Sequence, residues 1–169
     1  CASTESFVGA MVMNAYLLAL EIEPVNVGTG YSSLPLHCTI MHWFLSLKGL
    51  NAIVDATKDI ITMSRPITLV SKRSVLFGPN SDVPVNILAR NEARDLLHLK
   101  LFRALNGIGV VYTEPGYVGD GYSAHVTTQK GGAFAPGTSH VAKSVYLVEA
   151  LPDGVPPTRY IGARLCFSE

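Results

Sequence analysis

The sequence contains the same three-residue pattern twice, as His37-Cys38-Thr39 and as His125-Val126-Thr127. Each copy lies in an apolar run that indicates a β-strand, and in a strand residues i and i+2 point to the same face. Each copy therefore presents an imidazole and a hydroxyl side by side, with the middle residue turned away. Two such surfaces brought together would offer two histidines and two hydroxyls, a set able to hold a phosphate and to move protons on both sides of it.

These residue types suit the cleavage of a phosphodiester without a metal ion. One group must take a proton from the attacking water or hydroxyl, and another must give a proton to the leaving oxygen. A histidine with a pKa near 6.5 can do either at neutral pH. We predict His37 and His125 as the catalytic acid and base, in an order that the sequence leaves open. Thr39 and Thr127 are predicted to donate hydrogen bonds to the non-bridging phosphate oxygens, where charge gathers in the transition state.

Aromatic residues close to the two motifs are candidates for stacking on a nucleobase. Trp43 has the same strand parity as His37 and is the best placed of them. Tyr122 belongs to the glycine- and tyrosine-rich loop that leads into the second motif. We predict both as substrate-binding residues.

Strand parity also assigns several polar side chains to positions outside the site. His42 lies five residues beyond His37, so it is expected to face away and to have a structural role, and Cys38 is expected to point opposite to His37. His98, next to the apolar stripe of a helix, is expected at the surface or at its boundary. A zinc site from Cys38 and His42 is not expected, because no second pair of ligands appears. We predict no metal ion and no cofactor.

The flanking sequence predicts strands and helices that place each motif in its own lobe. One helix is predicted over residues 47–61, with Ser46 as its cap, and a second begins at the cap Asn91 and ends at Gly107. Besides the two motif strands, strands are predicted over residues 15–22, 67–77, 83–89, 141–151 and 160–167. This order predicts one domain over residues 1–169 with an α+β fold. The expected fold is bilobal, with two similar lobes of antiparallel sheet, helices on the outer face and a central groove carrying both motif strands.

Composition restricts the ligand and the location. Only 15% of the residues are charged and their charges balance to zero, so a broad grip on duplex nucleic acid is not expected, and a nucleotide or a short RNA end is favoured as the partner. Three cysteines without a CxxC pair indicate a reducing compartment. The apolar stretch from Val8 to Leu20 is interrupted by Asn14 and lacks a basic leader. We therefore predict no signal peptide, no membrane span and a cytoplasmic location.

In this context the two motifs resemble those of the two-histidine (2H) phosphoesterase superfamily. That group is defined by two H-x-T/S motifs on neighbouring strands of a bilobal α+β fold, and it includes the bacterial 2′-5′ RNA ligase proteins and the cyclic phosphodiesterases. The resemblance implies a metal-independent hydrolase for a 2′,3′-cyclic phosphate, a 2′-5′ linkage, or a small cyclic nucleotide or oligonucleotide signal. The alternative is a non-catalytic nucleotide-binding module, a sponge for a signalling nucleotide, that uses the same groove. The sequence does not decide the substrate, the regiochemistry, hydrolysis against ligation, or the oligomeric state.

Overall fold

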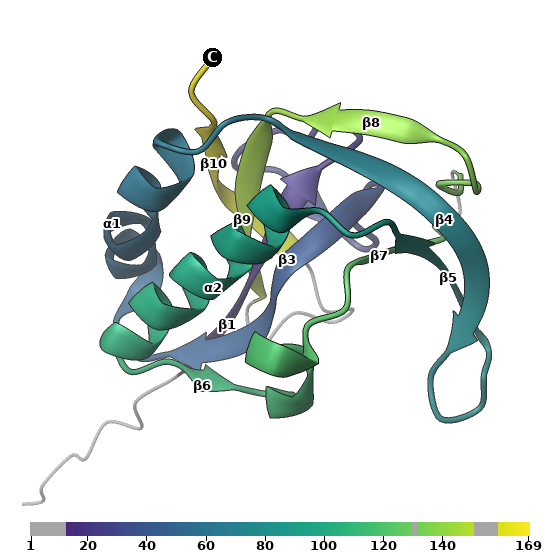
Figure 1. Cartoon of the computed structure of the whole chain (residues 1–169). Coiled ribbons are helices and arrows are strands. Elements are labelled where there is room, and N and C mark those ends of the chain that lie inside the picture. The colour runs from purple at the N-terminus through teal and green to yellow at the C-terminus, as the bar shows by residue number, and fades with distance from the viewer. Residues whose placement is uncertain (1–12, 130–131, 151–158) are drawn as a thin grey trace, which may run out of the picture.

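The computed structural model describes residues 13–129, 132–150 and 159–169. These residues form an antiparallel sheet of ten strands with two helices, α1 (Gly49–Thr62) and α2 (Glu92–Gly107) (Figure 1). The strands are β1 (Asn14–Glu21), β2 (Gly30–Tyr31), β3 (His37–Ser46), β4 (Ile67–Phe77), β5 (Val83–Leu88), β6 (Val111–Tyr112), β7 (His125–Thr127), β8 (Ser139–Ala142), β9 (Ser144–Ala150) and β10 (Arg159–Cys166). Two short 3-10 helices, η1 (Pro115–Tyr117) and η2 (Gly119–Gly121), precede β7. The predicted α+β class with antiparallel pairing is confirmed.

The two motif strands are neighbours in the middle of the sheet. The strand order is β2-β10-β9-β1-β3-β7-β5-β4-β8, with β6 paired to β3 off this path. Both helices cover one face of the sheet, α1 against β9 and β10 and α2 against β3 (Figure 1). The opposite face of β3 and β7 is therefore left open for a site.

Strand β1 pairs with the first motif strand, β3, and its burial shows how the core fixes the orientation of the motif strands. Its residues Tyr16–Leu20 are all buried, because alternate side chains face two different clusters. One cluster lies under the helices and also contains Cys38 and Val126, the middle residues of the two motifs, both with 0% exposure. The predicted turning of the middle residues away from the site is confirmed. Burying both residues fixes which face of the sheet the histidines and threonines occupy.

The helix boundaries follow local signals, with one correction. Asn91 caps α2 as predicted, since its Oδ1 accepts a hydrogen bond from the backbone N–H of Arg94 at 2.9 Å. The prediction of Ser46 as the cap of α1 is wrong. Ser46 ends β3 and its Oγ accepts the N–H of Lys48, so it stabilises the turn before the helix.

The predicted single strand over residues 141–151 is also wrong in its described part. The chain forms β8 and then β9, separated at Lys143. Strand β8 pairs with β4 at the end of the sheet order, whereas β9 pairs with β1 and β10. One continuous strand cannot serve both pairings, so the chain breaks where it changes partners.

Among the described residues, no helix combines the length and the apolar character needed to cross a bilayer.

Candidate active site

The two motifs meet crosswise on the open face of the sheet. Cys38 and Val126 are register partners in the antiparallel β3–β7 pair. The flanking residues of such a pair face each other in reverse order, so His37 lies across from Thr127 and Thr39 lies across from His125. The two histidines thus occupy opposite corners of a four-residue set, the motif cluster, and each has one threonine along its strand and the other across from it. All four side chains line one groove of about 1040 Å³.

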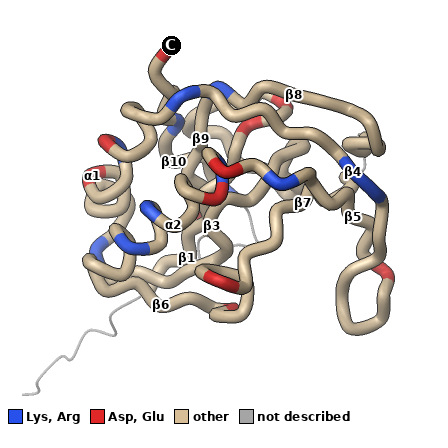
Figure 2. Tube along the Cα trace, in the orientation of Figure 1, with Lys and Arg blue, Asp and Glu red and all other residues tan. Residues whose placement is uncertain are grey.

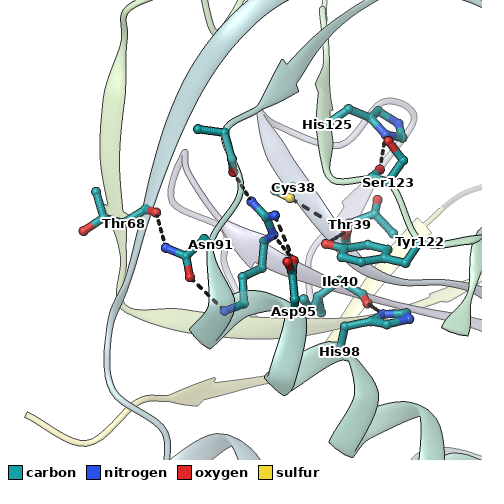
Figure 3. Close-up of polar contacts among 12 residues, drawn as sticks. Cys38, Thr39, Ile40, Thr68, Asn91, Asp95, His98, Tyr122, Ser123 and His125 are labelled. Carbon is teal, nitrogen blue, oxygen red and sulfur yellow. Dashed lines mark hydrogen bonds and ion pairs between the residues drawn. The ribbon is translucent and has the colours of Figure 1, made fainter. Parts of the chain in front are cut away.

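The two imidazoles are oriented by the same backbone contact. Nδ1 of His37 lies 2.8 Å from the carbonyl oxygen of Pro35. Nδ1 of His125 likewise lies 2.8 Å from the carbonyl oxygen of Ser123, a contact that Figure 3 shows. A carbonyl oxygen can only accept, so Nδ1 carries the hydrogen and donates it. Nε2 of each ring is then left for the groove, where it accepts a proton when neutral and donates one when protonated.

The surroundings of the two rings differ. Burial lowers the pKa of His37; the hydrogen bond to the Pro35 carbonyl opposes this effect, and the positive charges of His125 and Arg159 add to it. The neutral form of His37, the form that accepts a proton, is therefore favoured at neutral pH. His125 packs edge to face against Phe77 on the β4–β5 hairpin, with ring centroids 5.1 Å apart.

The groove is suited to an anionic ligand. Of the described residues that line it, one is an arginine, Arg159, and none is a carboxylate. The Arg159 guanidinium is held by a 2.8 Å hydrogen bond to the backbone oxygen of Ser32. Elsewhere basic and acidic residues are interspersed along the chain (Figure 2). Further lining residues are Leu17, Ser33, Leu34, His42, Trp43, Leu76, Phe77, Gly78, Pro79, Val83, Val85, Gly116, Tyr117, Gly121, Tyr122, Ser123 and Gln129.

The two aromatic candidates both reach the groove but in different ways. Trp43 lines it and also packs against the small core cluster on that side of the sheet. Tyr122 has one ring face covered by His98, at a centroid distance of 4.0 Å, and its hydroxyl donates to the backbone oxygen of Thr39 at 3.1 Å (Figure 3). Tyr122 is thus tied to the first motif strand as well as forming part of the wall.

The expectation that His42 faces away from the site is wrong. The register between β1 and β3 shifts twice, so that Leu18 pairs with Met41, Ala19 with Thr39 and Tyr16 with Phe44. Each shift inserts one extra residue in β3, as a β-bulge does. The extra residue between Thr39 and Met41 turns Met41 into the core. The extra residue between Met41 and Phe44 lets His42 and Trp43 both line the groove. Cys38 points into the core whereas His42 lines the groove, so the side chains of Cys38 and His42 cannot bind the same ion.

The expectation that His98 lies at the surface or at its boundary is wrong as well. His98 is 1% exposed, because it lies four residues after Arg94 and three before Leu101 on the buried side of α2. That helical spacing was the signal in the sequence from which the burial of His98 could have been predicted.

In the described part of the chain, no three His, Cys, Asp or Glu side chains gather in a group that could hold a metal ion. Lys130, the basic residue three positions after the second motif, lies outside the described residues.

Known structures match this arrangement of elements along nearly the whole chain. A crystal structure of a phosphoesterase superposes with a TM-score of 0.64 at 14% identity, covering 92% of this chain and 99% of that one. E. coli LigT in complex with 3′-AMP gives a TM-score of 0.64 at 13% identity, with 94% and 100% covered. TT0787 of Thermus thermophilus gives 0.58 at 12% identity, with 91% and 97% covered.

These matches define the fold. The chain has the fold of these structures, which include a phosphoesterase and E. coli LigT, and this agrees with the α+β fold that the resemblance implies. No family model matches the sequence, and no curated protein does.

Proposed function

We propose that this protein is a metal-independent phosphodiesterase that cleaves a nucleotide phosphodiester with His37 and His125 as its acid/base pair. The crosswise motif cluster carries the proposal, because a phosphate at its centre has an imidazole on each side and a threonine hydroxyl beside each imidazole. E. coli LigT has been solved in complex with 3′-AMP, NADP+ and ATP, which supports a nucleotide as the ligand of this groove.

The chemistry needs two proton transfers on opposite sides of phosphorus. Neutral His37 takes the proton of an attacking water or ribose hydroxyl as the new P–O bond forms. Protonated His125 gives its Nε2 proton to the leaving oxygen as the old P–O bond breaks. Thr39 and Thr127 donate hydrogen bonds to the non-bridging oxygens, whose negative charge grows in between. We assign the base to His37 because its buried surroundings favour the neutral ring.

Product analysis by mass spectrometry tests this function. The panel contains 2′,3′-cyclic nucleotides, 2′-5′ oligoadenylates, cyclic dinucleotides and trinucleotides, and RNA with cyclic ends, each assayed with and without EDTA. We expect at least one substrate to be cleaved, and the rate to fall by about 10²–10⁴ in His37→Ala and in His125→Ala. The double variant should be little worse than the single ones, because the two groups act as a unit.

His140→Ala is the matched control, since His140 is absent from the groove lining and contacts the backbone of Glu21. It should keep the wild-type rate. A protein that binds nucleotides but releases no product over hours is the nucleotide-binding module instead. A protein that neither binds nor cleaves any member of the panel contradicts both functions.

A further inference from the structure

His42 presents an unused ring nitrogen to the groove. Its Nδ1 is buried and has no hydrogen-bond partner among the described residues. Its Nε2 makes no hydrogen bond to a described residue either, but it is not buried. This nitrogen therefore faces the groove that the ring lines. A neutral imidazole has one donor and one acceptor. Protonation would place a positive charge on a half-buried ring whose Nδ1 has no partner, and burial accordingly lowers the pKa of His42, against the opposing charge of Glu114. The ring therefore offers an uncharged polar contact at Nε2.

An exposed aromatic ring packs against the His42 imidazole. Tyr117, on η1, lines the groove and is 58% exposed, which is unusual for a large aromatic side chain. Its ring centroid lies 5.1 Å from that of His42, and the two planes are inclined by 67°. A flat molecule stacked on Tyr117 lies parallel to the phenol ring and so meets the imidazole at a steep angle. The pair thus combines a stacking surface with a hydrogen-bonding atom at the side of whatever stacks there.

The pair is also placed at one end of the motif cluster. His42 follows Thr39 by three residues on β3, and the loop that holds Tyr117 leads into His125 on β7. Arg159 lies close enough to His37 to lower its pKa, whereas the charged residue that acts on His42 is Glu114, which precedes η1 and does not line the groove. A ligand whose phosphate occupies the cluster can therefore extend a flat uncharged group toward Tyr117.

We propose that Tyr117 and His42 form a nucleobase subsite, in which the base stacks on the phenol ring and its edge hydrogen-bonds to Nε2 of His42. A nucleobase has both the π-face and the hydrogen-bonding edge that this pair needs, whereas a sugar or a phosphate lacks the π-face. The inference rests on the proposed function, because the phosphate in the motif cluster fixes where the base lies. His42 would then be a specificity-determining residue that selects among bases by their edges.

Calorimetric binding of ligands that carry a phosphate monoester tests the subsite without any need for turnover. The probes are adenosine 3′-monophosphate, cytidine 3′-monophosphate and ribose 5-phosphate. For the wild-type chain we expect the better of the two nucleotides to bind roughly 5- to 100-fold more tightly than ribose 5-phosphate, from stacking of the base. Tyr117→Ala should remove most of this difference.

His42→Phe isolates the hydrogen bond, because phenylalanine keeps a ring against Tyr117 but has no ring nitrogen. It should weaken nucleotide binding roughly 3- to 10-fold and leave the affinity for ribose 5-phosphate unchanged. Tyr160→Ala is the control for loss of an exposed tyrosine, since Tyr160 is 38% exposed and does not line the groove. It should leave every Kd unchanged, and thermal unfolding of each variant verifies that it folds.

Three results overturn the subsite. The wild-type chain binds nucleotide and ribose 5-phosphate equally tightly, or it binds no probe at all. In the third, the difference in affinity between nucleotide and ribose 5-phosphate is the same in Tyr117→Ala and His42→Phe as in the wild type. Loss of the proposed function is a separate outcome. A chain that releases product but binds ribose 5-phosphate as tightly as a nucleotide keeps the hydrolysis and loses the subsite. A chain that binds the base through these two residues and releases no product keeps the subsite and loses the hydrolysis.

Discussion

The imidazole of His98 lies flat against the phenol ring of Tyr122, with ring centroids 4.0 Å apart and planes inclined by 7°. The same imidazole donates from Nδ1 to the backbone oxygen of Ile40 at 2.7 Å and accepts at Nε2 from the backbone N–H of Gly119 at 2.9 Å (Figure 3 shows the contact with Ile40). Ile40 follows Thr39 in the first motif strand, and the Gly119–Tyr122 segment leads into the second. One buried side chain of α2 thus fixes the backbone next to both motifs.

The replacement His98→Phe is predicted to destabilise the protein while keeping the stacked ring. Phenylalanine fills a similar volume, but it leaves the Ile40 carbonyl and the Gly119 N–H buried without partners. Each such group costs about 1–3 kcal/mol, so the free energy of unfolding should fall by about 2–6 kcal/mol in urea titration. Leu99→Ala, on the exposed side of the same helix, should change it far less. A His98→Phe variant as stable as the wild type would contradict the bracing role.

The two motif threonines are predicted to contribute comparably to the rate. Thr39→Val and Thr127→Val keep the β-branched shape and remove one hydroxyl donor each, so kcat for the cleaved substrate should fall by about 10²–10³ in either variant. Thr128→Val is the matched control, because Thr128 follows the second motif and does not line the groove. Comparable losses are expected because the crosswise pairing gives both hydroxyls equivalent positions. Unchanged turnover in both motif variants would remove the threonines from the site.

Gly121 is predicted to be irreplaceable for steric reasons. A Cβ at this position would overlap the carbonyl group of Gly116, because the two backbone segments of the η1–η2 loop approach each other closely. Gly121→Ala must therefore displace the loop and should lower Tm by several degrees, at roughly 2–4 °C per kcal/mol for a chain of this size. A Cβ at Gly116 meets open space, so Gly116→Ala should change Tm by less than Gly121→Ala. The reverse order in a thermal scan would contradict the loop geometry.

The free energy of unfolding is predicted to decrease as the pH is lowered from 8 to 5.5. Burial lowers the pKa values of His37, His42 and His98 below their ordinary value near 6.5. Below that value the unfolded chain binds protons that the folded chain does not, so the free energy of unfolding is largest above pH 6.5 and falls as the pH drops toward the folded-state pKa values.

Each such histidine adds up to about 1.4 kcal/mol per pH unit to this slope. Urea titrations at several pH values measure it, and His98→Gln should make it shallower. Leu105→Ala, which opens a cavity near α2 without removing a titrating group, should lower stability by the same amount at every pH. A pH-independent wild type would contradict the burial of these rings.

Local pattern was sufficient for most of the elements. The strands and helices follow apolar periodicity and, at Asn91, a side-chain cap, and these are properties of neighbouring residues that tertiary packing did not override. The strand over 141–151 could not be predicted correctly, because its break at Lys143 depends on the pairing partners of its two halves. The first half pairs with β4, and the second pairs with β1 and β10. The cytoplasmic location and the single-domain organisation stay predictions of the sequence.

The limit of sequence reasoning at the site is seen by comparing His37 with His42. Parity counting placed His37, Thr39 and Trp43 on the groove side, where they lie. It failed for His42, because the two register shifts in β3 become visible only when that strand is aligned with β1. Phe77 and Arg159 could not have been found either, since they reach the groove from strands distant in the sequence.

The sequence by itself determined the two motifs, their strand context and the faces that Cys38 and Val126 had to bury. These features depend on residue type and on a period of two along the chain. Tertiary structure alone decided that the motifs pair crosswise, that both imidazoles donate through Nδ1, and that a third histidine enters the groove. Those features depend on register between strands and on backbone carbonyls of other residues, and no spacing within a single strand encodes them.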